Sequence, residues 1–180
     1  MLNKLKTFIK HLWLDAGDAQ RAIPPDVLRR IGHRVAASER RHSGEIRICV
    51  EASLPMSYLR RLNARTAMPQ LVRQRAVTMF GKLRVWDTEH NNGVLIYMLL
   101  AEHAIEIVAD RGVARHVGPE QWQAMVARMA GAFQEQRYED GLTLALEETS
   151  ALLMAHFAVD DSEGGSQTNP NELPDAPLLQ

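Results

Sequence analysis

Residues 94–100, VLIYMLL, constrain the fold most, because seven consecutive apolar residues leave no polar side for water. Side chains of a β-strand alternate between two faces, so both faces of this strand must be covered. The run therefore predicts a central strand with helices packed on either side. It follows directly on a polar turn, residues 86–93 (WDTEHNNG), so the chain passes from a loop into the core within one residue.

Two further strands are indicated on either side of this run in the sequence. Residues 45–52 place Ile46, Ile48 and Val50 on one side and polar side chains or Cys49 on the other, a pattern that predicts a half-buried strand. Residues 104–109 follow the central strand after about three residues, so the two should form an antiparallel hairpin. A helix separates the first strand from the central one, so these two should be parallel.

Helices are predicted where apolar residues recur at helical spacing. The expected helices cover 2–14, 24–42, 69–84, a segment from 118 to about 133, and 140–157, with a short helix within 53–67. These elements predict a three-layer α/β sandwich, a small mixed sheet with helices on both faces. We expect residues 1–23 to form an amphipathic helix and linker, 24–157 the α/β domain, and 158–180 a disordered acidic tail rich in Asp, Ser, Gly, Asn and Pro.

Composition excludes several classes of protein. A single cysteine, Cys49, excludes an intramolecular disulfide framework and a multi-cysteine zinc site, and it is expected to be a small packed residue. No window approaches the roughly 18 apolar residues of a membrane span. The N-terminus lacks the continuous apolar region of a signal peptide. We therefore expect a cytoplasmic protein that can lie at the periphery of the inner membrane.

Charge is divided between the halves of the chain. Residues 1–85 hold 17 Lys or Arg against 6 Asp or Glu, and residues 86–180 hold 4 against 16. This asymmetry indicates either a basic arm for nucleic acid or membrane, or one globule with a basic and an acidic face. The second interpretation is favoured, since the basic residues stand at helical spacing among apolar ones. The sequence argues against nucleic-acid binding, because these arginines are not interleaved with exposed aromatic residues.

The N-terminal helix is the expected surface for a partner. Its apolar side chains form one stripe, and three lysines lie elsewhere on residues 2–14. An amphipathic helix of this kind can lie on an anionic membrane surface. A plain docking helix or a dimer contact is the alternative, and the sequence favours it. The stripe comprises Leu2, Leu5, Phe8, Ile9, Leu12 and Trp13.

Polar residues gather at one end of the predicted sheet. If the hairpin turns near Glu102, Gly93 lies across from about Asp110, so the loop 86–92 meets the segment 110–112. Carboxylates and amides in a turn supply oxygen ligands for Mg²⁺ or Ca²⁺. The alternative is a loop terminator at Asn91-Asn92-Gly93 and a simple ion pair between Asp110 and Arg111. The candidate metal ligands are Asp87, Glu89, Asn91, Asn92 and Asp110.

Four segments together resemble the TPM-domain family, whose founders include a thylakoid-lumen acid phosphatase and a photosystem II repair protein. They are RAVTMFGKLRV (75–85), NNGVLIYMLL (91–100), AIEIVADRGV (104–113) and AFQEQRYEDGLTLAL (132–146). The resemblance spans about residues 25–157. It implies a three-layer α/β fold, and a divalent-cation site with phosphatase activity or a role in maintaining membrane complexes. It aligns Asp87, Asn91, Asn92 and Asp110 with the family's loop region. Common bacterial members carry a signal peptide and a C-terminal hydrophobic segment, which this sequence lacks.

Other catalytic patterns are absent from the sequence. Cys49 has Pro55 instead of arginine six residues on, which excludes a C-x₅-R phosphatase loop. No P-loop, G-x-G-x-x-G turn, G-x-S-x-G elbow or H-E-x-x-H pair occurs. Two functions remain. The first is a binding or accessory module for membrane or envelope complexes. The alternative is a divalent-metal-dependent phosphomonoesterase in which Arg111 neutralises phosphate and His90 shuttles a proton.

Overall fold

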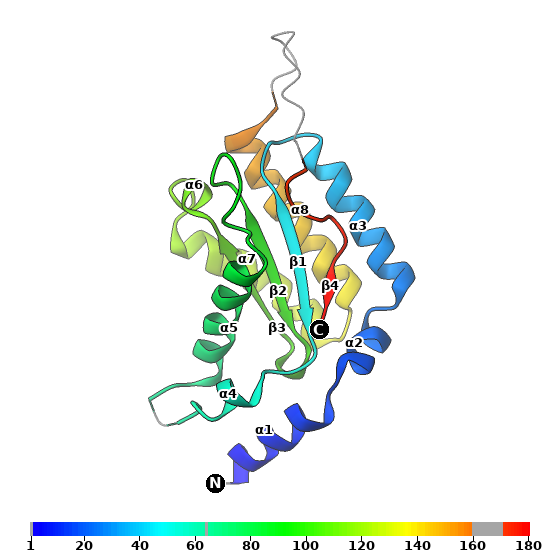
Figure 1. The fold of residues 1–180 in the computed structure, drawn as a ribbon, viewed down its shortest axis with the longest axis vertical. Coiled ribbons are helices and arrows are strands. Elements are labelled where there is room, and N and C mark those ends of the chain that lie inside the picture. The colour runs from blue at the N-terminus through cyan, green and yellow to red at the C-terminus, as the bar shows by residue number, and fades with distance from the viewer. Residues whose placement is uncertain (1, 64, 160–170) are drawn as a thin grey trace.

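A four-stranded mixed sheet lies between two layers of helices in the computed structural model, which describes residues 2–63, 65–159 and 171–180 (Figure 1). The sheet order is β3-β2-β1-β4. The three-layer α/β sandwich expected from the sequence is therefore confirmed. The strands are β1 (Ile46–Glu51), β2 (Val94–Leu99), β3 (Ala104–Ala109) and β4 (Leu178–Leu179).

The central position of β2 is confirmed by its pairing. It runs parallel to β1, with Ile46 opposite Val94, and antiparallel to β3, with Val94 opposite Ala109. A single 3₁₀ turn, η1 (Leu100–Glu102), closes the hairpin between β2 and β3. Every residue of β2 is buried, because its alternate side chains enter two separate apolar clusters on the two faces of the sheet.

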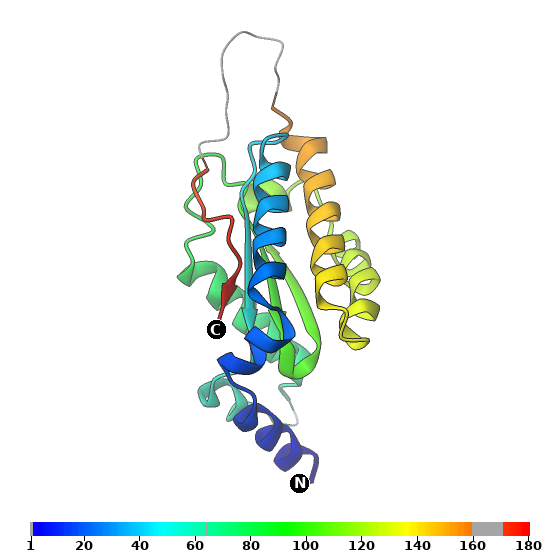
Figure 2. The same cartoon turned by 90° about the vertical axis from the view of Figure 1, so that its right-hand side faces the viewer.

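One face of the sheet carries the larger apolar cluster and is covered by α2, α3, α7 and α8, and the other face is covered by α4 and α5 (Figure 2). The helix α1 (Leu2–Trp13) lies at one end of the molecule beside α4, and the one-turn α6 (Arg111–Ala114) follows β3 (Figure 1). None of the described helices has the length and apolarity to cross a bilayer. The covering helices are α2 (Ala16–Ala22), α3 (Pro25–Glu39), α4 (Met56–Leu59), α5 (Met68–Lys82), α7 (Pro119–Gln134) and α8 (Tyr138–Phe157).

Two local expectations from the sequence are wrong. The linker expected at 15–23 contains α2, which is started by a capping box in which Asp15 and Asp18 accept hydrogen bonds from each other's backbone N–H groups. The strand expected to be half-buried, β1, is buried along its whole length. The alternating pattern predicted an exposed side because Arg47 and Glu51 are charged, but both side chains are buried and hydrogen bonded in the folded chain.

The expected disordered tail is also wrong for its last ten residues. Residues 171–180 lie along β1, and β4 pairs with β1 in parallel. Leu173 is buried in the smaller apolar cluster. The physical reason is that the outer edge of β1 presents unpaired backbone groups, and an extended segment satisfies them. The rest of the expected tail, residues 160–170, lies outside the described residues.

Candidate functional site

Three segments meet at the end of the sheet where β1 and β2 begin and β3 ends. The backbone N–H of Asp110 donates to the carbonyl oxygen of Gly93 at 2.8 Å, as the hairpin register predicts. The N–H of Val94 donates to the carbonyl oxygen of Glu45 at 2.8 Å, which joins the start of β1 to the start of β2. The structure therefore brings the loop 86–93, the residues before β1 and the residues after β3 to one place.

Close backbone packing shapes this loop. A Cβ on Gly93 would overlap the carbonyl oxygen of Val85, and a Cβ on Gly112 would overlap that of Asn91. Asn91 itself has φ +53°, a left-handed conformation that asparagine tolerates better than most residues. Its carbonyl oxygen accepts the N–H of Gly112 at 2.9 Å. The Asn-Asn-Gly sequence thus lets the loop turn and press against both α5 and α6.

Asn92 is fully buried and connects the loop to β1. Its side-chain Nδ2 donates to the carbonyl oxygen of Ser43 at 3.0 Å, and its backbone N–H donates to Thr88 Oγ1 at 3.1 Å. The side-chain oxygen Oδ1 is buried and has no hydrogen-bond partner among the described residues. Such an atom is costly in a folded protein, so it indicates either a bound water or a ligand.

Asp110 is the second residue here with an unsatisfied buried oxygen. Its Oδ1 accepts the backbone N–H of Arg111 at 2.7 Å and so caps the first turn of α6. Its Oδ2 is buried without a hydrogen-bond partner in the described part of the chain. The ion pair considered for Asp110 and Arg111 is replaced by this backbone contact. The Arg111 side chain is exposed and reaches Asn91 Oδ1 at 3.4 Å.

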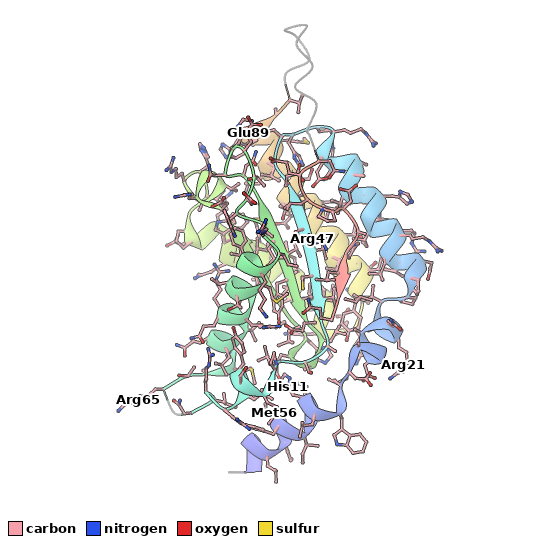
Figure 3. The ribbon with its side chains drawn as sticks, in the orientation of Figure 1. His11, Arg21, Arg47, Met56, Arg65 and Glu89 are labelled. Carbon is pink, nitrogen blue, oxygen red and sulfur yellow. The ribbon has the colours of Figure 1, made fainter. Side chains whose placement is uncertain are left out.

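The other predicted site residues lie at the surface of the loop. Asp87 is exposed and lies 3.9 Å from Arg84, measured between Oδ2 and Nη1. Glu89, labelled in Figure 3 at the end of the molecule opposite α1, is exposed, and its N–H donates to both carboxylate oxygens of Glu172 at 3.2 Å. His90 is also exposed.

The donor set does not form a complete cation site as it is folded. Within the described residues, which include the whole loop, no three His, Cys, Asp or Glu side chains are arranged to hold a metal ion. The residues present instead supply two buried oxygens, Asn92 Oδ1 and Asp110 Oδ2. Mg²⁺ and Ca²⁺ require about six or more oxygens, so Asp87 and Glu89 would have to turn inward, or water would have to complete the shell.

The sequence placed Glu45 at this end of the sheet, but it did not reveal that Glu45 is buried in an acidic group with Glu39 and Asp175. Glu39, at the end of α3, is buried and accepts the N–H of Ile46 at 2.7 Å. Glu45 is fully buried and accepts the N–H of Leu173 at 3.0 Å. Burial raises the pKa of Glu39 to about 9, and the nearby charges of Glu45 and Asp175 act in the same direction. No sequence signal reveals this group, because Asp175 comes from the segment that was expected to be disordered.

Two other reactive side chains, Cys49 and His42, are fully buried. Cys49 is fully buried on β1, and burial raises the pKa of its thiol to about 12. This confirms Cys49 as a packed residue, since a thiol with so high a pKa supplies little thiolate nucleophile. Burial lowers the pKa of His42 to about 4, so its ring is neutral at physiological pH. Its Nδ1 lies 3.0 Å from the carbonyl oxygen of Gly44.

Comparisons with known proteins agree with this architecture. A sequence profile of the TPM domain matches residues 17–152. Among solved structures, the NMR structure of the BA42 protein from the psychrophilic bacterium Bizionia argentinensis superposes with a TM-score of 0.69 at 22% identity. The match covers 87% of this chain and 94% of that protein, and at this identity it shows a shared fold. No curated protein matches the sequence.

Proposed function

This chain belongs to the TPM-domain family, and we propose that it acts as a peripheral accessory module that binds an anionic membrane surface through α1 and α4. The observation that carries the proposal is the exposure of large apolar side chains on α1. Trp13 is 81% exposed, Leu12 64% and Leu5 63%. Ile9 and, on α4, Met56 are also exposed and add to this surface. Clustered exposed apolar residues indicate an interaction site.

The helix α1 is held in place by contacts that turn these residues outward. The N–H of Leu54 donates to His11 Nδ1 at 3.0 Å, and His11 Nε2 lies 3.1 Å from Glu102 Oε1. Because Nδ1 accepts a hydrogen bond, the proton of the neutral ring is on Nε2 and is donated to Glu102. Phe8 packs against the smaller apolar cluster. The docked face of α1 therefore includes His11 and Phe8, and the rest of the described apolar stripe, Leu5, Ile9, Leu12 and Trp13, is exposed.

Exposed basic side chains lie on the same elements at this end of the molecule. Lys6 on α1 is exposed, and so are Arg60, Arg61 and Arg65, which follow α4. Figure 3 shows His11 and Met56 near each other at this end, with Arg65 on the neighbouring turn. Apolar side chains that enter the lipid interface, with lysine or arginine at their margins, are typical of helices that lie on anionic membranes.

Vesicle co-sedimentation tests this proposal. The full chain should pellet with vesicles of phosphatidylcholine and phosphatidylglycerol, and pelleting should weaken as salt is raised. The double variant Leu12→Ser with Trp13→Ser should bind at least about tenfold less, since each large apolar side chain contributes about 1.5–3 kcal/mol when buried. Val77→Ser is the matched control, because Val77 is exposed on α5, outside this surface.

The outcomes separate the membrane from other partners. Equal pelleting of the double variant and the wild type contradicts the proposal, and so does equal binding to vesicles of phosphatidylcholine alone. If no vesicle binds but the wild type self-associates in ultracentrifugation and the double variant does not, the surface is a protein contact. Near-UV circular dichroism should show that both variants keep the wild-type tertiary packing.

Asp110 Oδ2 favours a second candidate, a phosphomonoesterase that uses a divalent cation. A bound Mg²⁺ or Ca²⁺ would polarise a phosphate and lower the pKa of a bound water. In this chain Asp110 and Asn92 would supply buried oxygen ligands, and the exposed Arg111 lies beside them to bind a phosphate. The incomplete donor set makes cation binding the property to test first.

A titration followed by NMR tests this second candidate. Amide signals of residues 86–92 and of Asp110 should shift as Mg²⁺, Mn²⁺ or Ca²⁺ is added, and Asp110→Asn should remove most of the shift. Asp140→Asn is the control, because Asp140 is exposed at the start of α8 and pairs with Arg137. Shifts that persist in Asp110→Asn, or cation binding without hydrolysis of an aryl phosphate, contradict the phosphatase.

A further inference from the structure

The C-terminal segment, residues 171–180, lies along the edge of β1, and its end pairs with β1 as the two-residue strand β4. Figure 2 shows it alongside the sheet, on the side away from α8. Cys49 lies opposite Leu178 and Val50 opposite Leu179, in parallel register. The N–H of Gln180 donates to the carbonyl oxygen of Val50 at 2.9 Å, and the N–H of Ala52 donates to that of Gln180 at 2.8 Å. Main-chain hydrogen bonds of this kind are the usual basis of peptide recognition by strand addition.

Arg47 provides a second set of backbone contacts. It projects from β1 in the middle of the sheet (Figure 3) and is only 8% exposed. Its Nη1 donates to the carbonyl oxygens of Pro174, at 2.6 Å, and Ala176. A buried guanidinium is costly unless its donors are satisfied, and here the main chain of the segment accepts two hydrogen bonds from Nη1. Arg47 therefore forms its hydrogen bonds with the main chain of the extended segment and not with its side chains.

The start of the segment is held by one apolar side chain and one carboxylate. Leu173 is buried in the smaller apolar cluster, and its N–H donates to the fully buried Glu45. Glu39 faces Asp175 nearby, and its raised pKa leaves it protonated at neutral pH, so it does not add a negative charge next to Asp175. The domain thus carries buried polar groups whose partners are supplied by the segment.

We propose that the edge of β1 is a peptide-binding groove, that residues 171–180 are its resident ligand, and that an extended, leucine-containing segment of a partner protein replaces them by strand addition. The contacts support exchange because the polar ones at β1 are made to main-chain atoms of the segment, and its apolar ones are made by leucines: Leu173 is buried in the smaller cluster, and Leu178 and Leu179 pack against the two clusters. Any extended peptide with a leucine at the place of Leu173 meets the same donors and acceptors. The groove is separate from the α1 surface, so it does not depend on membrane binding.

Covalent attachment makes the resident segment a competitor. A tethered ligand has an effective concentration of about a millimolar. If a free peptide binds the empty groove with a dissociation constant on the order of 10 μM, the attached segment weakens its apparent binding by about 100-fold. The attached C-terminal segment would therefore exclude peptides that bind the groove weakly, and only a partner that binds tightly would replace it.

The experiment uses the full chain with a specific protease site introduced within residues 160–170. A fluorescent peptide with the sequence of residues 171–180, NELPDAPLLQ, is titrated before and after cleavage, and binding is followed by anisotropy. Cleavage followed by gel filtration should strengthen apparent binding by about 100-fold. The peptide carrying Leu173→Asp should bind at least about tenfold more weakly, and this control leaves the protein unchanged.

Arg47→Met in the cleaved chain should weaken binding by about tenfold or more, because it removes two charge-assisted hydrogen bonds. Arg84→Met is the matched control, because Arg84 is an exposed arginine that follows α5 and is not part of β1. The proposal is overturned if the cleaved protein keeps its segment against excess peptide or loses cooperative unfolding. Equal binding of the Leu173→Asp peptide overturns it too. If the uncleaved chain forms dimers by exchanging the segment and captures no peptide, the occupant is a second copy and the partner assignment fails.

Discussion

Glu51→Gln is expected to lower the free energy of unfolding by about 3–5 kcal/mol, the cost of breaking a buried ion pair by removing one charge. Glu51 and Arg75 are both buried and joined by two hydrogen bonds, Nε to Oε2 at 2.8 Å and Nη2 to Oε1 at 2.6 Å. The amide of glutamine has nearly the same size, so the loss reports the uncompensated guanidinium and not a cavity. Urea unfolding followed by circular dichroism measures it, with the m-value as a check on two-state behaviour.

The network around this pair explains the size of the effect. Tyr97 on β2 donates its hydroxyl hydrogen to Glu51 Oε2 at 2.7 Å, and burial together with the Glu51 charge raises the pKa of Tyr97 above its usual range. The Arg75 guanidinium lies 5.4 Å from the centre of the Tyr58 ring on α4. The pair thus links β1, β2, α5 and α4, so it also supports the surface proposed for membrane binding.

Two further variants make this prediction specific. Glu106→Gln, on the half-exposed pair that Glu106 forms with Arg73 at 3.3 Å, should change stability by less than about 1 kcal/mol. The double variant Glu51→Leu with Arg75→Met should be more stable than Glu51→Gln, because it leaves no buried charge unpaired. A loss below about 1 kcal/mol in Glu51→Gln would show that the pair is solvated in solution.

Gly93→Ala is expected to cost about 3 kcal/mol, at the upper end of overpacking effects, because the new methyl group meets main-chain atoms. The added Cβ would overlap the carbonyl oxygen of Val85 and approach its carbonyl carbon at 3.1 Å. A flexible side chain could move aside, but this carbonyl belongs to the backbone where the chain leaves α5. The loop that carries Asp87, Asn91 and Asn92 would therefore separate from β2. Thermal and urea unfolding measure the loss of stability.

Gly81→Ala is the matched control for Gly93→Ala. It lies in α5, no atom is within 4 Å of a Cβ placed there, and alanine should stabilise the helix by up to about 1 kcal/mol. Opposite signs for two glycine-to-alanine changes in the same region would separate packing from intrinsic helix propensity. If Gly93→Ala is as stable as the wild type, the loop does not pack against α5 as described.

Much of the fold follows from local patterns in the sequence. The run at 94–100 indicated a strand covered on both faces, and β2 is buried throughout. The spacing between it and the next apolar segment gave the hairpin and placed Asp110 opposite Gly93, where the two are hydrogen bonded. These predictions succeed because apolar periodicity and short connections act over a few residues.

The sequence predicted where the candidate site lies, but not which of its side chains are buried. The loop, the residues before β1 and the residues after β3 do meet, but Asp87, Glu89 and His90 are exposed, and only Asn92 and Asp110 place oxygens in a buried setting. A loop sequence specifies which side chains are near each other, but it does not specify which of them face inward. That choice depends on close packing against Val85 and Gly112.

The sequence by itself determined the order of β1, β2, β3 and the long helices, the mixed sheet and the family. Only the tertiary structure shows that the charged side of β1 is buried and that the C-terminal segment pairs with β1. Arg47 and Pro174 are 127 residues apart in the chain, and neither local pattern predicts their contact. Charged residues at alternate positions ordinarily indicate a solvent-exposed face, because burial of a charge is costly without a partner. Here the partners come from α5 and from residues 171–180, so only the folded chain shows that this face is covered.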